Sequence, residues 1–399
     1  MCELQITPPH IATVWASWRA LLKALRGNAL ATFPREAFED DIVVHRFLGH
    51  RQLIFNRPDA IRRILVENSG NCIRTAPTIR VLGPVFGCGL FLSTGEDWKR
   101  QRRTTASAFA QRAVRILARH VAAAENSLIA DLMASGRSQI DLIPVLQRLA
   151  LEIIGSAMFS LEMKKHGGEM RRLILRYAAH LGRPTLLDFV LPLEIPTPFD
   201  IGRRRFRRRW IALIERMIDE RGRRPRHRAQ PDLFDLLVAD RPEGGALAEQ
   251  LADQVATIVV AGHETTAAAL FWSLYLMASV PDEQEAVAAE AASVDLGPEG
   301  AADAAPQLIR TRAIVEETLR LYPPTFVIVR QALAEDLVDG ILVPARSLVL
   351  VAPWVLHRHR RLWDKPEAFD PSRFLPGAPP PARFAYMPFG AGPRVCIGG

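Results

Sequence analysis

The chain has 399 residues, of which 49% are apolar and 24% charged, and its formal net charge of +8 suits nucleic acid, anionic lipid or an acidic protein. Nucleic acid is the least favoured partner, because the sequence has neither zinc-finger spacing nor an RNA-binding aromatic motif. No signal peptide is predicted, and the spacing of the cysteines indicates neither a zinc module nor a disulfide scaffold, so we expect a cytoplasmic protein. The cysteines are Cys2, Cys72, Cys88 and Cys396.

The first predicted elements are short strands followed by a helix. Two runs rich in Val, Ile and Phe flank Gly49 and predict a β-hairpin. After Pro58, the apolar residues Ile61 and Ile64 recur at helical spacing, which predicts a helix. Residues 69–95 are rich in Gly, Pro and Thr, and we expect a loop there.

The middle of the chain, residues 96–240, is predicted to be mostly helical. One apolar stripe at spacings of four, three and four residues is formed by Phe206, Trp210, Leu213 and Met217. The arginines between residues 203 and 209 cover the rest of that helix. Exposure to water is the favoured interpretation of this basic face, and contact with an anionic membrane is the alternative.

Residues 245–280 predict one long helix whose second half is apolar almost all round. A transmembrane span is therefore an alternative that must be considered. His263 and Glu264 lie at its middle, where exposure of charge to lipid is costly, and we find no second segment of this kind. We therefore expect a helix buried in the core of a large domain, with no transmembrane span.

The C-terminal part combines one helix with strands and irregular chain. Residues 307–322 predict the helix, and residues 325–354 predict strands with a turn at Asp339-Gly340. Residues 364–395 hold many prolines and glycines and are expected to be irregular but packed. The predicted fold is mainly α with a minor antiparallel β-sheet, and no linker divides residues 1–399, so we expect a single domain.

The last eleven residues, FGAGPRVCIGG, place a cysteine among glycines. Glycines let the backbone curl so that N–H groups point at a thiolate and moderate its charge. The spacing FxxGxRxCxG resembles the haem-binding motif of the cytochrome P450 family, the haem-thiolate monooxygenases, without departure. The resemblance implies that Cys396 is the axial ligand of haem b, that Arg394 reaches a haem propionate and that Phe389 shields the sulfur; the remaining matched positions are Gly392 and Gly398.

Three further segments resemble the same family, so the resemblance extends from about residue 41 to the end. The first is an ExxR pattern in which Glu317 and Arg320 share one helix face. Such a pair alone is weak, because most are surface ion pairs. The resemblance implies that Arg373 joins them in a buried structural network, which fixes the chain that leads to the cysteine loop.

The second segment is AGHETT, residues 261–266. The resemblance places it over the distal face of the haem, where Gly262 lets the helix backbone approach the reacting oxygen. The hydroxyl of Thr265 can bond to a carbonyl of its own helix and open that helix locally. Glu264 and Thr265 resemble the acid–alcohol pair that delivers protons, whereas a satisfied polar cluster in a core helix is the structural alternative. We assign His263 no catalytic role.

The third segment matches WxxxR. Trp98 and Arg102 are four residues apart, so both lie on one helix face and can reach one haem propionate. Arg330 resembles a further propionate ligand of the family. A positively charged face beside this segment is expected to recruit an acidic electron donor, and it comprises Lys99, Arg100 and Arg103.

The resemblance implies a monooxygenase that inserts one oxygen atom from O₂ into a lipophilic small molecule. A thiolate ligand pushes electron density toward the O–O bond. The sequence has no complete GxGxxG fingerprint for flavin or nicotinamide, so a ferredoxin or flavodoxin type donor with its reductase is implied. The residues of segment 325–328, TFVI, are mostly apolar and are expected to contact the substrate.

Other functions remain as alternatives. A haem-thiolate peroxygenase would use peroxide, and a haem sensor would perform no oxygenation; the Glu264-Thr265 pair disfavours both. The family continues after its cysteine loop into a long helix and further strands, whereas this chain stops at Gly399. We therefore expect a single domain without these C-terminal elements, and a haem-binding fragment without activity is an alternative.

Overall fold

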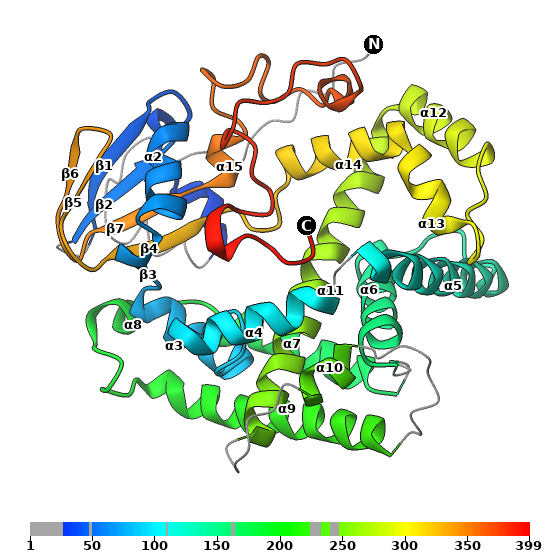
Figure 1. Ribbon diagram of the computed structural model, residues 1–399, viewed down its shortest axis with the longest axis horizontal. Coiled ribbons are helices and arrows are strands. Elements are labelled where there is room, and N and C mark those ends of the chain that lie inside the picture. Colours follow the sequence, from blue (N-terminus) through cyan, green and yellow to red (C-terminus); the bar gives the residue numbers. More distant parts are fainter. Residues whose placement is uncertain are drawn as a thin grey trace.

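The computed structural model describes residues 27–47, 50–108, 111–160, 163, 165–223, 233–239 and 247–399 (Figure 1). Over these residues the fold is mainly helical, with a small sheet at one edge, which confirms the predicted class. The longer helices are α3 (Ala76–Phe86), α4 (Gly95–Ala108), α5 (Gln111–Ser135), α6 (Leu142–Phe159), α7 (Gly167–His180), α9 (Pro198–Gly222), α11 (Leu247–Ser279), α12 (Pro281–Ala292) and α14 (Ile309–Leu321).

Shorter helices and turns connect these elements. The short α-helices are α2 (Pro58–Arg62), α8 (Leu186–Val190), α10 (Leu233–Ala239), α13 (Ala301–Ala304) and α15 (Pro353–Leu356). A π-helical turn, η3 (Arg63–Glu67), continues α2, and the 3₁₀ turns are η1 (Ala29–Thr32), η2 (Arg35–Phe38), η4 (Ser69–Asn71), η5 (Ala305–Gln307), η6 (Pro371–Phe374) and η7 (Gly392–Arg394).

The main sheet has five strands in the order β1-β2-β7-β4-β3. The strands are β1 (Ile42–Phe47), β2 (His50–Phe55), β3 (Cys72–Ile73), β4 (Ile328–Ala332) and β7 (Leu348–Val351). Its antiparallel pairs are β1–β2, β3–β4 and β4–β7, but β2 and β7 run parallel, with Gln52 opposite Leu348. The predicted antiparallel sheet is therefore mixed, because β7 reaches β2 through a long helical crossover rather than a hairpin.

Both predicted hairpin turns connect paired strands. Strands β1 and β2 pair up to Phe47 opposite His50, while Gly49 lies outside the described residues. A second hairpin joins β5 (Asp336–Val338) to β6 (Ile341–Val343). At its turn Asp339 and Gly340 have φ angles of +52° and +77°, the left-handed backbone that a tight two-residue hairpin needs.

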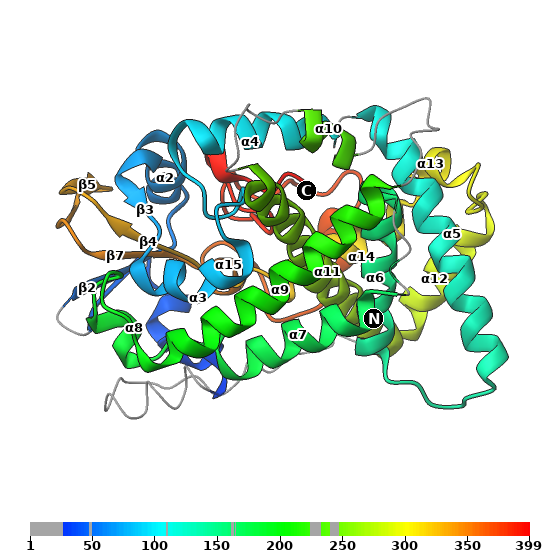
Figure 2. The ribbon, with the colours of Figure 1, turned by 90° about the horizontal axis from the view of Figure 1, so that it is seen from below.

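Helix α11 runs through the centre of the molecule (Figures 1 and 2). Figure 2 shows α4 toward one edge of the view and α7 toward the opposite edge, with α11 between them. Helices α6, α9, α3 and α14 pack against it. The predicted long helix is confirmed from Leu247 onward, while residues 245 and 246 lie outside the described residues.

The predicted apolar stripe of α9 is buried in the largest core cluster. Trp210, Leu213 and Met217 are inaccessible to solvent, and the indole of Trp210 donates a hydrogen bond of 3.0 Å to the carbonyl of Val85. Burial of these large side chains fixes α9 against α3 and α11. The helical spacing therefore identified the correct face of α9.

The predicted loop at residues 69–95 is wrong in its middle, which forms α3. Thr75 accepts a hydrogen bond from the N–H of Thr78 as N-cap, and Pro77 stands in the first turn, where its missing N–H costs nothing. Val81 and Val85 are buried. The Gly and Pro content of this segment predicts a loop, whereas its N-cap at Thr75 and its buried Val81 and Val85 favour the helix that forms.

The helix predicted at residues 307–322 is α14, and residues 364–395 are irregular apart from η6 and η7, as expected. Two described helices, Leu142–Phe159 and Gln250–Ser279, are long and apolar enough to cross a membrane, so the expectation that no second segment of this kind exists is wrong. Length and composition alone are weak grounds for a span, because a core helix has the same character. These two helices pack against each other at the centre of the fold.

Candidate functional site

Cys396 lies exposed on the C-terminal loop, two residues after the end of the 3₁₀ turn η7. Its N–H donates a 2.9 Å hydrogen bond to the carbonyl of Phe389, which closes the loop. Gly392 has a φ of +71°, and a Cβ at this position would collide with the carbonyl oxygen of Leu65 in η3. The loop therefore needs glycine at residue 392, while Gly398 lies exposed in the turn after the cysteine.

Helix α4 brings the predicted tryptophan and arginine to this loop. The guanidinium of Arg394 lies 4.2 Å from the ring centre of Trp98, a cation–π contact. Arg102 donates a 2.6 Å hydrogen bond to the carbonyl of Val395, next to the cysteine. Arg394 also donates a 2.8 Å hydrogen bond to the carbonyl of Ser93. Residues far apart in the chain thus form one cationic neighbourhood beside Cys396.

The arginines of this neighbourhood lower one another's pKa values. Burial lowers the pKa of Arg74 to about 9, helped by the nearby charges of Arg330 and Arg394. Burial and the charges of Arg330 and Arg102 lower the pKa of Arg394 to about 10. Burial also lowers the pKa of Arg330. We name Arg74, Arg102, Arg330 and Arg394 the arginine cluster.

Within the described part of the chain, no carboxylate forms an ion pair with a member of the arginine cluster, and Nη1 of Arg394 is buried without a hydrogen-bond partner. Buried charges normally have partners. A ligand with two carboxylates, such as the propionates of haem, would supply them, so these residues fit that group. Arg74 was not predicted from the sequence. The sequence shows it only as a cation that directly precedes the N-cap residue of α3, which does not indicate a ligand site.

The AGHETT segment lies in the middle of α11. The hydroxyl of Thr265 donates a 2.6 Å hydrogen bond to the carbonyl of Ala261, as the sequence predicted. The helix nevertheless continues unbroken from Leu247 to Ser279, so no local opening occurs here. A Cβ on Gly262 would lie 2.7 Å from Cδ1 of Ile154 in α6. The close packing of α6 is therefore a reason for this glycine that the sequence did not indicate.

Glu264 extends toward α6 and belongs to a polar chain. Its carboxylate accepts a 3.2 Å hydrogen bond from Nε2 of Gln147, and Oε1 of Gln147 accepts a 2.8 Å bond from Arg171. Burial raises the pKa of Glu264, and the Gln147 hydrogen bond and the charge of Arg171 oppose that change. Gln147 and Arg171 were missed, because nothing in their local sequence connects them to residue 264.

His263 lies on the buried side of α11. Neither ring nitrogen has a hydrogen-bond partner, and Nδ1 is 3.4 Å from Oε1 of Glu264. Burial, then the charge of Arg171, lowers the pKa of His263 to about 4. The imidazole is therefore neutral at pH 7, and it provides no ion pair to the glutamate.

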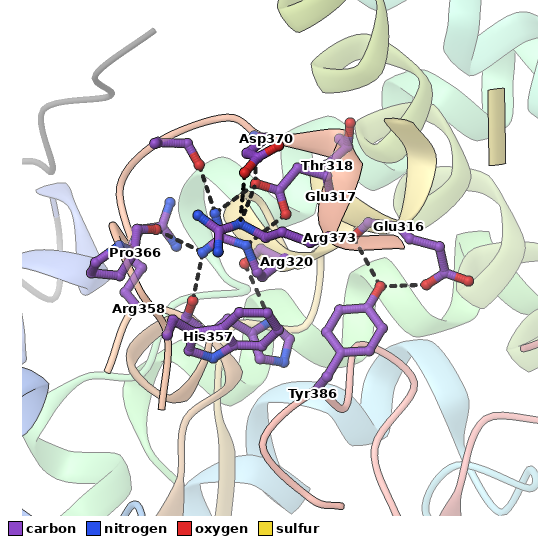
Figure 3. A network of polar contacts seen from close by, with 12 residues as sticks. Glu316, Glu317, Thr318, Arg320, His357, Arg358, Pro366, Asp370, Arg373 and Tyr386 are labelled. Atoms are coloured by element: carbon purple, nitrogen blue, oxygen red, sulfur yellow. Dashed lines mark hydrogen bonds and ion pairs between the residues drawn. The ribbon is translucent and has the colours of Figure 1, made fainter. Parts of the chain in front are cut away.

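Figure 3 shows a second charged assembly, around Arg320 in α14. Two hydrogen bonds of 2.7 Å join Arg320 to the carboxylate of Glu317, and both side chains are inaccessible to solvent. Arg320 also donates to the carbonyls of His357, Pro366 and Ala368, over 2.8, 2.6 and 2.8 Å respectively. The guanidinium thereby connects three separate points of the chain that leads to the cysteine loop.

The carboxylate of Glu317 has further partners in this assembly. Glu317 accepts a 2.9 Å hydrogen bond from the N–H of Asp370, and Nε of Arg373 lies 3.7 Å from it. Burial raises the pKa of Glu317, and the Arg320 hydrogen bonds oppose this. The structure thus brings together Glu317, Arg320 and Arg373, the three residues of the network that the resemblance implied.

His357 is a further connection, which was not predicted from the sequence. Its Nε2 accepts a 3.0 Å hydrogen bond from the N–H of Met387, two residues before Phe389, so its Nδ1 carries the proton and donates to the carbonyl of Arg320. Burial lowers its pKa to about 3. A neutral histidine of fixed tautomer therefore holds the approach to the cysteine loop.

The face predicted to attract an electron donor is less positive than its sequence suggests. Lys99 forms a 2.7 Å ion pair with Glu96, and Arg100 forms a 3.1 Å ion pair with Asp97. Both pairs lie within one turn of α4, with Lys99 exposed and Arg100 partly buried, so each cation is partly neutralised by its neighbour.

Comparisons with known proteins agree with this arrangement. The sequence model of the family described as Cytochrome P450 matches residues 8–399. Two relatives come from Streptomyces melanosporofaciens. Cyclooctatin synthase is 33% identical over 86% of this chain and 74% of that protein. Cyclooctat-9-en-7-ol 5-monooxygenase is 30% identical over 98% of this chain and 83% of that protein.

Two solved structures share the fold. A cytochrome P450 named CYP102L1 has a TM-score of 0.76 at 25% identity, over 95% of this chain and 88% of that one. The retinoic acid bound cyanobacterial CYP120A1 has a TM-score of 0.72 at 24% identity, over 90% of this chain and 80% of that one.

The fold and these matches define the class of haem-thiolate oxidoreductases. The chain belongs to the cytochrome P450 family. It is accordingly a monooxygenase-type oxidoreductase, and its cofactor is haem b with a cysteine thiolate ligand.

Proposed function

We propose that this chain oxygenates a lipophilic small molecule with O₂, using electrons from an external donor and a haem b held by Cys396. The observation that carries the proposal is the arginine cluster beside an exposed cysteine, since its members have no acidic partner among the described residues. The haem, when bound, supplies the redox chemistry that activates O₂.

The residues around the haem have distinct tasks in this proposal. Arg74, Arg102, Arg330 and Arg394 neutralise the propionates, and Trp98 packs against Arg394. Phe389 limits the access of water to the thiolate. Gly392 and Gly398 permit the turns of the loop, while Glu317, Arg320 and Arg373 hold the preceding chain in place.

Glu264 and Thr265 move protons in this proposal. Burial raises the pKa of Glu264, which brings the carboxyl group closer to the range in which it can both release and accept a proton near neutrality. Thr265 is exposed, and its hydroxyl donates a hydrogen bond to the carbonyl of Ala261. The hydroxyl oxygen can therefore accept a hydrogen bond along which a proton is passed. Gly262 allows α11 to lie close to α6.

The substrate and the donor are argued from chemistry. Segment 325–328 follows α14, and the apolar character of Phe326, Val327 and Ile328 favours a lipophilic substrate. The name of one relative describes oxygenation at position 5 of cyclooctat-9-en-7-ol, which supports the same class. The proposed electron donor is of the ferredoxin or flavodoxin type, with its reductase. It docks at Arg103 and at the partly neutralised Lys99 and Arg100 beside it. The proposed location of the protein is the cytoplasm.

The test is the spectrum of the reduced, carbon-monoxide-bound protein. The wild type and the control Cys88→Ser should bind haem stoichiometrically and give the red-shifted Soret band of thiolate ligation, which Cys396→Ala should lose. A retained band in Cys396→Ala overturns the ligand assignment. With the ligand established, turnover driven by peroxide but not by a ferredoxin or flavodoxin system would favour the peroxygenase instead.

A further inference from the structure

Residues 87–93, between α3 and α4, form a tight loop. The N–H groups of Leu92 and Ser93 donate hydrogen bonds of 3.0 and 2.9 Å to the carbonyl of Gly89. The N–H of Gly89 donates a 2.9 Å hydrogen bond to the carbonyl of Phe86, the last residue of α3. These bonds close the segment into a compact turn. We name residues 87–93 the glycine loop.

The glycine loop contacts two members of the arginine cluster. The carbonyl of Ser93 accepts a 2.8 Å hydrogen bond from Arg394. The guanidinium of Arg74 lies 5.1 Å from the ring centre of Phe91, a cation–π contact. A carbonyl and a phenyl ring carry no net charge, so they orient the two arginines without neutralising them. The position of the glycine loop therefore influences where both guanidinium groups point.

Asp253 of α11 fixes the other end of the glycine loop. Its side chain is buried, and its carboxylate accepts a 2.7 Å hydrogen bond from the N–H of Cys88. Gly87 has a φ of +50°, and a Cβ at this position would collide with the Asp253 carboxylate. A Cβ on Gly89 would collide with the hydroxyl of Thr257, one turn further along α11. The glycine loop therefore fits closely against α11 at Asp253.

Two further helices reach the same point. Helix α9 packs across α11 (Figure 2), and its Arg207 forms a 2.8 Å ion pair with Asp253. The buried Gln101 of α4 donates a 3.1 Å hydrogen bond to the carbonyl of Cys88 and accepts one of 3.1 Å from the hydroxyl of Ser93. Printed contacts thus connect Arg207 and Asp253, through the glycine loop, to the residue whose carbonyl holds Arg394.

We propose that Asp253 is a positioning residue for the haem: by fixing the glycine loop against α11, it orients Arg394 and Arg74 toward the propionates. This inference rests on the proposed function, in which those arginines neutralise the propionates. Asp253 acts through the loop and not on the haem itself. If the loop shifts, the arginines compensate the propionate charge less well. The haem then accepts an electron less readily, because uncompensated negative charge opposes reduction.

The reduction equilibrium between the haem-loaded full-length protein and a reference dye tests the proposal. Asp253→Ala removes the acceptor of the Cys88 N–H, so the equilibrium constant for one-electron reduction should fall by roughly 2- to 30-fold, the range for residues that act through a contact network. Asp253→Asn keeps the volume and an acceptor oxygen, so it should fold and show a smaller fall. Arg207→Gln, which removes the ion pair from α9, should also lower the constant.

Arg216→Gln is the matched control. It breaks an exposed 2.9 Å ion pair between α9 and Glu169 and should leave the reduction equilibrium unchanged. A purely structural role of Asp253 would lower the urea midpoint without changing the reduction equilibrium. The effect of Asp253→Ala should also be smaller in an Arg394→Gln background than in the wild type, because the glycine loop then has one arginine fewer to orient.

An unchanged reduction equilibrium in Asp253→Ala overturns the proposal, and Asp253→Asn decides in the same way if the alanine variant does not fold. An equal effect in the wild-type and Arg394→Gln backgrounds, or in the Arg216→Gln control, also overturns it. If Arg394→Gln itself changes neither the reduction equilibrium nor the affinity for haem, the proposed propionate role of Arg394 fails, and this inference fails with it. An effect of Arg394→Gln without any effect at Asp253 overturns this inference alone.

Discussion

The network at Arg320 and the arginine cluster at Cys396 handle buried charge in opposite ways. In the network, Arg320 donates to one carboxylate and three carbonyls, and Glu317 receives bonds from Arg320 and from the backbone of Asp370. In the cluster, Arg74 and Arg394 are surrounded by further cations, with no carboxylate among the described residues to pair them.

This difference separates a scaffold from a ligand site. A buried ion pair with every hydrogen bond made is complete within the chain, and it serves to hold segments together. A group of partly buried cations that repel one another is unfavourable in the free chain and becomes favourable only with an anionic ligand. The two regions should therefore respond in opposite directions when a charge is removed.

Removing the carboxylate from the network should have the largest effect. Glu317→Ala leaves Arg320 buried without its partner, and the loss of such a partner destabilises by about 3–5 kcal/mol. We expect a lower urea midpoint or failure to fold, whereas the exposed control Glu285→Ala should change little. A Glu317→Ala variant as stable as the control would show that the network is not a scaffold.

Removing a cation from the arginine cluster should make the haem-free protein more stable, which is the opposite of the effect expected for Glu317→Ala. Arg74→Met relieves repulsion from Arg330 and Arg394, so the free energy of unfolding of the haem-free protein should rise. The dissociation constant for haem should rise by about 10- to 100-fold, the usual worth of a charged hydrogen bond. Unfolding by urea and haem titration measure the two quantities.

Arg358→Met is the control for this comparison. Burial also lowers the pKa of Arg358, to about 10, but this arginine lies 3.2 Å from Glu367 and over the ring of Trp354. Its replacement should lower the stability of the haem-free protein. If Arg74→Met and Arg358→Met both lower it, the contrast between paired and unpaired cations fails.

The two regions also differ in how far sequence could predict them. Cys396, Arg394 and Trp98 stand in local motifs with fixed spacing, and those motifs were enough to identify them. Arg74 and His357 carry no such motif, and their roles arise only when α3 and α15 reach the cysteine loop and its approach. Tertiary proximity of this kind has no local signal.

The fold shows the same limit. Helical periodicity identified the buried face of α9 and the length of α11, because burial imposes that period on one element alone. The parallel pairing of β2 with β7 and the inward packing of Gly262 on Ile154 depend on two elements meeting. The sequence of one segment alone therefore predicts neither of these two contacts.

A smaller effect should follow from pH at His357. Its pKa falls from an ordinary value of 6.5 to about 3 in the folded protein, so the unfolded chain binds the extra proton first. The free energy of unfolding should therefore decrease as pH falls from about 6.5 toward about 3, by up to about 1.4 kcal/mol per pH unit from this group.

His357→Gln removes that titration. It should be less stable than the wild type at pH 8, because the hydrogen bonds to Met387 and Arg320 are disturbed, but the deficit should shrink as the pH falls below 6.5. The exposed His50→Gln serves as the control, and its difference from the wild type should not vary in this way. A deficit that stays constant between pH 8 and pH 5 would contradict a neutral, buried His357.

The smallest expected effect concerns Glu264, whose surroundings lie between the two extremes. Its carboxylate is partly buried and accepts a side-chain hydrogen bond from Gln147. That bond and the charge of Arg171 restrain the rise in pKa caused by burial.

Gln147→Leu removes the bond at similar volume, so the pKa of Glu264 should rise further. The alkaline limb of the profile of product formed per NAD(P)H consumed should move to higher pH, by about half a pH unit for one hydrogen bond, because a donor must be protonated to act. Gln147→Glu, which places a second carboxylate beside the first, should move it further in the same direction. Haem content and substrate binding should stay unchanged in both variants. A profile that moves to lower pH, or does not move in either variant, would show that Gln147 does not position the proposed proton donor.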